Sequence, residues 1–264
     1  MANIIALFRV PKLSYRVWKT WMRNKDVFMK TYKTNFLPSL LEPVLYLLAL
    51  GFGLGGFVQP IDGQPYIQFI APALVAVSMM FSSFYECTFA SFVRMYFQKT
   101  FDAIIATPVS IEEVITGEIL WGATKSLINS SIVLGVIIIF GVPPTPLFLL
   151  IPPLSFLVGL LFSSIAMCFT AIVPNIDSFN YPNFLFITPM FLLSGTFFPL
   201  TSMPELVQTA AQIFLPLTNA VTVTRALASG NIQLSVLLNL AWILIVTPIF
   251  VVLSINLMKK RLIK

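Results

Sequence analysis

Long apolar segments dominate this sequence and restrict the fold more than any other feature. Runs of about 20 apolar residues are long enough to cross the hydrocarbon core of a bilayer as an α-helix. Segments such as "LVGLLFSSIAM" (157–167) do not alternate between apolar and polar residues, which argues against the strands of a transmembrane barrel. We therefore predict an all-α membrane protein with six transmembrane helices, at about residues 36–58, 66–90, 115–140, 147–173, 183–200 and 234–258.

The composition supports an integral membrane protein and argues against chemistry within the chain. Hydrophobic residues make up 58% of the sequence and charged residues only 10%, whereas soluble domains carry about 25% charged residues. The chain has no histidine, and its two cysteines, Cys87 and Cys168, lie in apolar runs. Because no nucleophile–base pair or cluster of metal ligands is evident, we predict no catalytic residue and no metal site.

The distribution of Lys and Arg predicts the orientation of the chain. Eight basic residues precede the first predicted span, Arg94 and Lys99 lie between the second and third, and four more end the chain, whereas Arg225 alone falls on the opposite side. Since basic residues are retained in the cytoplasm, both termini are predicted to be cytoplasmic. The first apolar run begins too late and is too long for a cleavable signal peptide.

The N-terminal region has a period of its own. Four basic residues from Arg9 to Lys30 recur every seven residues, and aromatic residues occupy other sides of the same helical wheel. We predict that residues 1–34 form a basic amphipathic helix on the cytoplasmic membrane surface, ahead of a transmembrane domain at residues 35–264. Two interpretations are open: a topology anchor, or an interface helix that also touches a cytoplasmic partner.

The cytoplasmic segment between the second and third predicted spans contains signals for a short helix. Thr100 is placed to cap this helix, Asp102 falls in its first turn, and Pro108 follows its end. Ser110 and Glu113 then have the spacing of a capping box for the third span. A short exposed helix of this kind is either a docking element for a partner or an ordinary connector.

The segment "LLSGTFFPLTSMPELVQTAAQIFLPL" (192–217) starts like the end of a membrane helix and then contains three prolines. We predict that Pro199 and Pro204 end the fifth span, that residues 203–214 form a short helix that turns back, and that a second helix follows Pro216. Lipid cannot satisfy the free amides of a broken helix, so such a backbone must be buried in protein or line a wet cavity. A plain external loop is the alternative, but the apolar length argues against it.

Four charged residues fall within predicted spans: Glu42, Glu86, Glu118 and Lys125. A charge at membrane depth must face the bundle interior or a cavity, and Lys125 in particular needs a partner. Both Glu42 and Glu86 are placed within reach of it. The interpretations left open are a structural ion pair, a proton relay and a substrate contact.

An aromatic stripe runs along the second predicted span, where Phe81, Tyr85 and Phe89 recur at four-residue steps. Such a stripe packs against other helices or lipid, or it lines a pathway on which sugar rings or acyl chains slide. The nearby "GATKS" (122–126) is not a phosphate loop, because Thr124 stands where the motif requires glycine. The chain is therefore predicted to bind no nucleotide or other cofactor.

Three segments carry a family resemblance: "EPVLYLLALGFGLG" (42–55), "RMYFQKTFDAIIATPVSIEEVITGEILWGATKS" (94–126) and "ITPMFLLSGTFFPLTSMPELVQTAAQIFLPLTNAVTVTRAL" (187–227). With the basic N-terminus they make the chain similar to the membrane subunit, or permease, of ABC-2-type ABC transporters. The most similar branch is the nodulation-protein J-like one, which exports lipo-oligosaccharides. The third segment is the most specific, with family-like residues at Gly195, Phe198, Pro199, Pro204 and Pro216.

The resemblance implies a permease that forms a homodimer and works with a separate ABC ATPase, which binds ATP and Mg. It implies that residues 100–108 are the coupling helix that docks on this ATPase, with Phe101, Ile104 and Ile105 as apolar anchors. It also implies that the proline-rich segment is an external re-entrant hairpin between the fifth and sixth spans.

The resemblance further implies a bacterial inner membrane location, contact with membrane lipids and no nucleic-acid partner. The expected cargo is a glycolipid or lipid-linked oligosaccharide, with a hydrophobic drug as the main alternative. Two other classes of function are alternatives: a self-sufficient secondary transporter or channel, and an intramembrane enzyme. The lack of histidine and of a nucleophile–base pair argues against the enzyme.

Overall fold

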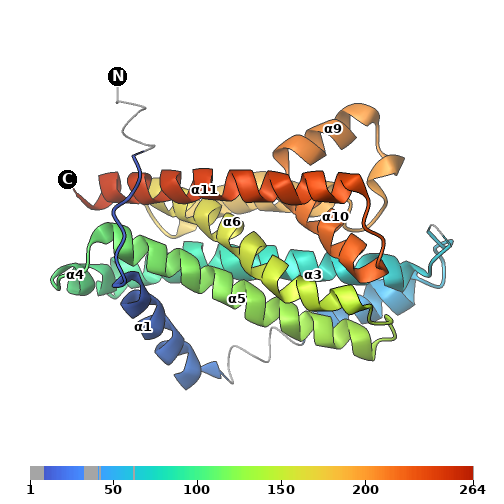
Figure 1. Cartoon of the computed structure of the whole chain (residues 1–264), viewed down its shortest axis with the longest axis horizontal. Coiled ribbons are helices and arrows are strands. Elements are labelled where there is room, and N and C mark those ends of the chain that lie inside the picture. The colour runs from blue at the N-terminus through green and yellow to red at the C-terminus, as the bar shows by residue number, and fades with distance from the viewer. Residues whose placement is uncertain (1–8, 33–40, 42, 62, 264) are drawn as a thin grey trace.

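The protein is described by a computed structural model covering residues 9–32, 41, 43–61 and 63–263. The described residues are almost entirely helical, and the long helices α3, α5, α6 and α11 run side by side along the longest axis of the molecule (Figure 1). The α-helices are α1 (Val17–Lys30), α3 (Tyr66–Tyr85), α4 (Thr100–Ile105), α5 (Ile111–Ile139), α6 (Ile151–Ile172), α7 (Asn180–Pro182), α8 (Thr188–Leu193), α9 (Glu205–Phe214), α10 (Pro216–Ser229) and α11 (Leu234–Leu262).

Shorter helical segments extend or join these helices. Those with π-helical hydrogen bonding are η2 (Leu47–Leu54), η3 (Glu86–Ala90), η4 (Val93–Phe97) and η7 (Asn183–Ile187). The 3₁₀ segments are η5 (Pro146–Leu150), η6 (Asp177–Phe179) and η8 (Leu200–Ser202). Because η3 and η4 continue α3, the second long helix reaches Phe97, well beyond the predicted boundary at residue 90.

Four helices in the described part of the chain are long and apolar enough to cross a membrane. They are Tyr66–Phe97, Ile111–Ile139, Pro146–Ile172 and Leu234–Leu262, which correspond to the second, third, fourth and sixth predicted spans. The pair α9 and α10, bent by 93°, passes the same test when taken together. Of the first predicted span, the apolar helix Pro43–Leu54 is described, whereas residues 36–40 and 42 lie outside the described residues.

The fifth predicted span is shorter than expected. Its helix comprises residues 180–193, and the prediction that Pro199 ends it is wrong, since α8 already ends at Leu193. Gly195 has a φ of +72°, the left-handed conformation that commonly follows the end of a helix. Pro204 precedes the first residue of α9, and Pro216 is the first residue of α10, where its missing N–H is not needed.

The helix α6 lies at the centre of the bundle and packs against α3, α5 and α11. Its contact with α5 is close because of Gly159: a Cβ atom added there would lie 2.6 Å from the Cβ of Ser126 and 2.8 Å from the Cα of Ala123. Small residues permit this approach of two backbones, which maximises contact between helices in a membrane. The crossing of α5 and α6 therefore depends on the absence of a side chain at residue 159.

Replacing Gly159 by leucine is expected to destabilise the bundle by about 1–3 kcal/mol or more, because the α5 backbone must move to admit the side chain. The matched control is Gly135→Leu on α5, where an added Cβ meets nothing within 4 Å. Thermal unfolding of the purified protein in detergent measures both effects. Equal unfolding temperatures for the two variants would contradict this account of the α5–α6 contact.

The N-terminal region is helical over a shorter stretch than predicted. Residues 9–14 are extended, and α1 starts at Val17. The extended residues are held by contacts with distant elements: Lys12 N–H donates to Glu112 Oε2 at 2.7 Å, and Asn256 Nδ2 donates to the carbonyl of Arg9 at 2.9 Å. These bonds replace those that a helix would have made. The segment thus ties the start of α5 to the end of α11.

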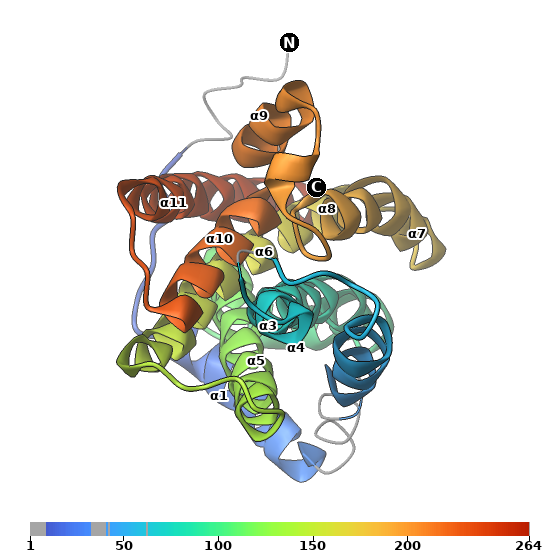
Figure 2. The same cartoon turned by 90° about the vertical axis from the view of Figure 1, so that its right-hand side faces the viewer.

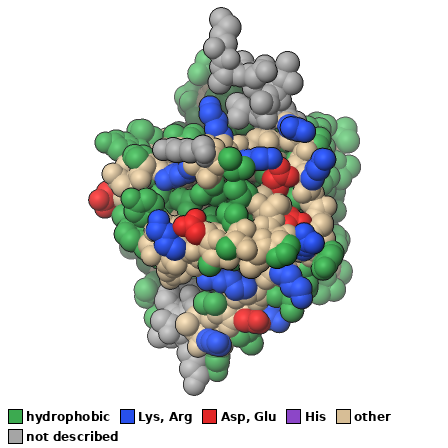
Figure 3. All heavy atoms as spheres, turned by 90° about the vertical axis from the view of Figure 1, so that its left-hand side faces the viewer, with side chains coloured by type: hydrophobic (Ala, Val, Ile, Leu, Met, Phe, Trp, Pro, Cys, Tyr) green, Lys and Arg blue, Asp and Glu red, His purple; other side chains and the backbone are tan. Residues whose placement is uncertain are grey.

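The two ends of the bundle differ in composition. The C-terminus, α4 and the extended N-terminal segment lie at one end, while α9 and the turn between α10 and α11 lie at the other (Figures 1 and 2). Lys and Arg side chains are spread over the face that carries α4 and the C-terminus (Figure 3). This is the charge distribution that the positive-inside rule associates with a cytoplasmic surface.

Candidate functional site

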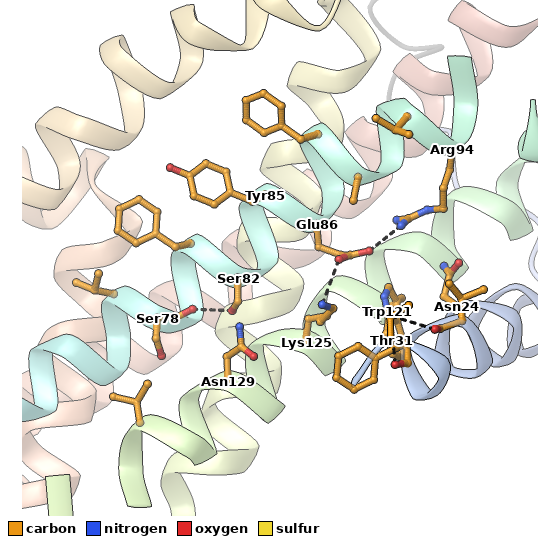
Figure 4. A pocket seen from close by; sticks show the side chains of 18 of the residues that line it. Asn24, Thr31, Ser78, Ser82, Tyr85, Glu86, Arg94, Trp121, Lys125 and Asn129 are labelled. Atoms are coloured by element: carbon orange, nitrogen blue, oxygen red, sulfur yellow. Dashed lines mark hydrogen bonds and ion pairs between the residues drawn. The ribbon is translucent and has the colours of Figure 1, made fainter. Parts of the chain in front are cut away.

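A cavity of about 720 Å³ lies between α1, α5, the helix Pro43–Leu54 and the long helix formed by α3, η3 and η4 (Figure 4). One part of its wall is apolar and includes Leu74, Val77, Phe81 and Val133. The other part is charged and includes Arg23, Glu86, Arg94 and Lys125. The cavity therefore offers apolar surface and ionic groups within one space.

Arg94 is the centre of the ionic part. Its Nη1 lies 2.8 Å from Glu86 Oε1, and its Nη2 and Nε donate to Glu118 Oε2 at 2.5 and 3.0 Å. The side chain of Glu118 is fully buried, and those of Arg94 and Glu86 are only 14% and 10% exposed. Arg94 thus supplies the positive charge that allows two carboxylates to remain inside the bundle.

Lys125 is held more loosely. Its Nζ lies 3.7 Å from Glu86 Oε2, longer than a direct hydrogen bond, and 4.7 Å from the centre of the Phe28 ring. Glu86 is one of the two partners considered for Lys125 from the sequence. The other, Glu42, lies outside the described residues.

Polar contacts extend from Glu118 through α1 to α4. Asn24 Nδ2 donates to Glu118 Oε1 at 2.8 Å, Arg23 donates to Asn24 Oδ1 at 2.9 Å, and a longer contact of 3.4 Å joins Arg23 to Thr100 Oγ1. Burial lowers the pKa of the Arg23 guanidinium, and the negative charge of Glu118 opposes that shift. Arginine remains a cation near neutral pH in either case. The cavity is thereby connected to the first residue of α4.

The π-helical segments position the ionic residues. Glu86 is the first residue of η3, and Arg94 lies in η4, so the two interacting side chains come from adjacent widened parts of one helix. In η3 the carbonyl of Cys87 accepts a hydrogen bond of 2.7 Å from Thr170 Oγ1 of α6. Single π-helical turns inside α-helices occur frequently at functional sites.

The predicted aromatic stripe both lines the cavity and packs against a neighbouring helix. Phe81, Tyr85 and Phe89 all contribute to the cavity wall. The Phe81 ring also lies 5.7 Å from that of Phe191, and Tyr85 donates a hydrogen bond of 3.3 Å to Asn183 Oδ1. The stripe therefore joins the cavity to the helix formed by residues 180–193.

The structure divides the residues of α4 between two surfaces. Phe101 is fully buried in the bundle, and Ile104 and Ile105 are partly buried against the same core. The prediction that Phe101 is free to anchor a partner is therefore corrected: Phe101 holds α4 on this chain. Thr100 is the first residue of α4 and not its cap, because Lys99 occupies the N-cap position. Pro108 lies beyond the helix, and its carbonyl accepts a hydrogen bond of 2.5 Å from Arg16.

The opposite surface of α4 is exposed, and its side chains are small or acidic. Asp102, Ala103 and Ala106 all face solvent. Beyond α4, the capping box predicted for the next helix is present, with Ser110 and Glu113 each bonding the other's backbone N–H at the start of α5. A firmly capped α5 and a buried Phe101 fix the direction in which α4 presents its exposed face.

Arg225 has a structural role that its sequence context did not indicate. Its guanidinium donates to the carbonyls of Phe69 at 3.1 Å and Gly195 at 2.8 Å, and it lies 3.7 Å above the Phe69 ring. These contacts fasten the turn after α8 to α3 and α10. The turn contains Phe198 and Pro199, neither of which contacts the cavity described above.

Comparison with known proteins gives a consistent set of relatives. The family model of the ABC-2 type transporter matches residues 15–228. The chain is 34% identical to Nodulation protein J of Sinorhizobium fredii (strain NBRC 101917 / NGR234) and 35% identical to Nodulation protein J of Rhizobium meliloti (strain 1021), with 92% of each chain covered in both cases. It is 23% identical to the inner membrane transport permease YadH of Escherichia coli (strain K12), over 70% of this chain and 72% of that protein. No solved structure matches the chain.

Proposed function

We propose, from the premise that this chain belongs to the ABC-2 type transporter family, that it is the permease subunit of an ATP-driven exporter. The observation that carries the proposal is the extent of the family match, which covers residues 15–228 and so includes α1, the cavity, α4 and the bent pair of α9 and α10. Export is the direction of transport that the resemblance to the nodulation-protein J-like branch implies, and the 34% identity to Nodulation protein J over 92% of the chain supports that resemblance.

The proposed arrangement has six spans, with the helix Pro43–Leu54 in the first and residues 180–193 in the fifth. Both termini and α4 face the cytoplasm of a bacterial cell whose inner membrane holds the protein, and α9 with α10 forms an external re-entrant hairpin. The gathering of Lys and Arg at the end that carries α4 supports this orientation (Figure 3). Residues 1–34 form the cytoplasmic surface region, and residues 35–264 form the transmembrane domain.

Two protein partners belong to the proposal. A separate ABC ATPase docks on the exposed face of α4 and holds ATP and Mg, and a second copy of the permease completes the transport path. An apolar surface supports the second copy: Tyr181, Phe184 and Leu185 are 70%, 66% and 74% exposed on the helix of residues 180–193. Exposed apolar groups on this scale mark contact with another chain or with lipid.

The proposed cargo is a glycolipid or lipid-linked oligosaccharide. A cavity that combines an aromatic wall with ionic groups suits a molecule that has both an apolar chain and a polar head. A hydrophobic drug is the second candidate, since Leu74, Phe81 and Val133 would also receive an uncharged apolar compound. A channel or secondary transporter is less favoured, because the family premise places the energy source in a separate subunit.

Reconstitution tests this function. Proteoliposomes that contain the permease and its ATPase should move a fluorescent short-chain glycolipid to the opposite leaflet only when ATP is present. Permease alone, and permease with an ATPase whose phosphate-loop lysine has been replaced, are the controls and should show background movement. Transport by the permease alone, or transport driven by an ion gradient, would refute the proposed mechanism.

A further inference from the structure

We propose that the cavity between α1, α3 and α5 is a binding site for an anionic amphiphile, a molecule with a phosphate- or sulfate-like group attached to a lipid chain. The inference rests on the proposed function, because it identifies the acidic group by which an exporter would select a lipid-like molecule at the cytoplasmic end of the bundle. The site combines two features: an excess of cationic over anionic side chains and an adjoining apolar wall.

The charge balance favours an anion. Among the described residues of the cavity, three cations, Arg23, Arg94 and Lys125, accompany one lining carboxylate, Glu86, and one buried behind it, Glu118. Arg94 is paired with both carboxylates, at 2.8 and 2.5 Å. Lys125 contacts Glu86 at 3.7 Å, and Glu86 already binds Arg94 more closely.

Arg23 adds to the positive charge. Its hydrogen bonds reach neutral groups, Asn24 Oδ1 and Thr100 Oγ1, and no carboxylate of the described residues lies within ion-pair distance of it. A guanidinium presents five N–H donors in a planar fork that matches the oxygens of a phosphate, and the Lys125 ammonium adds a compact point charge. Arg23 is partly buried, and burying a cation without a paired anion is costly. A bound phosphate or sulfate group would supply that anion.

The apolar wall favours a chain attached to that anion. Leu74 and Val77 on α3 and Val133 on α5 line the cavity away from the ionic groups, and Phe81 and Ser78 lie between the two parts. Figure 4 shows Ser78, Ser82, Glu86 and Arg94 following one another along the long helix, so Leu74 and Val77 lie toward the end of this row that is away from Arg94. A volume of about 720 Å³ lies in the range of small-molecule sites. A free phosphate would leave the apolar part empty.

Binding is tested with the full-length permease in nanodiscs of phosphatidylcholine, without the ATPase. Dioctanoyl phosphatidic acid is the probe, dioctanoylglycerol lacks its charge, and glycerol 3-phosphate lacks its chains. We expect the phosphatidic acid to bind at least roughly tenfold more tightly than either fragment, since each fragment loses one class of contact. Fluorescence is a suitable readout because Trp121 lines the cavity. Glycerol 3-phosphate or dioctanoylglycerol binding as tightly as the probe would overturn the proposal.

Substitutions identify the place of binding. Lys125→Gln and Arg23→Gln should each weaken phosphatidic acid binding by roughly tenfold, as expected for the loss of one charged hydrogen bond, and Ser78→Leu should weaken it by filling the space beside the chain. The control Lys19→Gln removes an exposed charge from the same helix as Arg23 and should bind as the wild type does. Because three separate variants are used, a folding defect in one leaves the others informative. Wild-type affinity in all three cavity variants would overturn the proposal.

Two further comparisons are needed. One distinguishes a bulk membrane lipid from a cargo molecule as the source of the ligand, and the other distinguishes this binding site from the proposed transport function. In nanodiscs rich in phosphatidylglycerol, loss of probe binding would identify a bulk membrane headgroup as the occupant, and retained binding would identify a cargo-type amphiphile; both results support an anionic amphiphile. Binding is measured without ATP, so it can succeed while ATP-driven export fails. Conversely, ATP-driven export that is insensitive to all three cavity substitutions would support the proposed function and contradict this site.

Discussion

Replacing Arg94 by methionine is expected to destabilise the permease by about 3–5 kcal/mol, the range found when one partner of a buried ion pair is removed. The arginine pairs with two carboxylates, at 2.8 Å for Glu86 and 2.5 Å for Glu118, and the second of these is fully buried. After the substitution Glu118 would keep only the hydrogen bond from Asn24. Thermal or denaturant unfolding of the purified protein in detergent measures the loss.

Lys125→Met is the matched control, since it also removes a cation that lies near Glu86. Its cost should be about 1 kcal/mol or less, because Glu86 keeps its closer contact with Arg94 and the lysine contact is 3.7 Å long. The double variant Arg94→Met with Glu118→Met should recover much of the stability lost in the single one, because no unpaired carboxylate then remains at residue 118. If the Arg94→Met and Lys125→Met proteins have the same free energy of unfolding, Arg94 is not the centre of this network.

Long helices could be predicted from the sequence because their determinants are local. Four apolar segments of sufficient length match helices of the structure, and the start of α5 was correctly assigned from Ser110 and Glu113. The break between α9 and α10 likewise follows from Pro216, which fits the first turn of a helix and not its interior. In each case the controlling residues are neighbours in the chain.

The ionic centre could not be predicted in full because it depends on contacts between distant residues. Hydropathy falls at Arg94, so the second span was predicted to end at residue 90, with Arg94 in the cytoplasmic segment between the second and third spans. In the structure the helix continues through η3 and η4 to Phe97, and the carboxylate of Glu118 lies beside the guanidinium. The high cost of a buried charge correctly marked Glu118 and Lys125 as inward-facing. Glu86, one of the two partners predicted for Lys125, lies 3.7 Å from it, but the sequence did not reveal that Arg94 would pair with Glu118.

The orientation of α4 could not be predicted from the sequence either. A helix of six residues makes fewer than two turns, so its apolar positions do not define a face by periodicity. From the sequence, Phe101 is equally suited to anchor a partner or to anchor α4 on the bundle. The structure shows its side chain fully buried in the bundle. A docking experiment must therefore be directed at the residues that α4 leaves exposed.

The double substitution Ala103→Glu with Ala106→Glu is expected to abolish co-purification of the ATPase with the permease in mild detergent. Ala103 is exposed on α4 and Ala106 is exposed directly after its last residue. Two carboxylates buried at a protein interface without partners cost several kcal/mol, which corresponds to at least roughly a hundredfold loss of affinity. The permease should fold normally, because Phe101, Ile104 and Ile105 still hold α4 on the bundle. Unfolding temperature and the size of the permease dimer, measured in parallel, check that separation.

Thr209→Glu on α9 is the control for this experiment, since it adds a charge to an exposed helix at the opposite end of the bundle and should leave ATPase association unchanged. Substitution of Ile104 would be less informative, because that side chain is partly buried against the core and its loss would perturb the permease itself. If the ATPase still co-purifies with the double variant, α4 is not the docking element. The next surface to test is then α1, where Trp18 is 54% exposed and Lys19 lies beside it on the exposed side. A shift of the docking site to α1 would also change how the ATPase reaches the cavity, because Asn24 of that helix accepts a hydrogen bond from Arg23 and donates one to Glu118, the carboxylate that Arg94 binds.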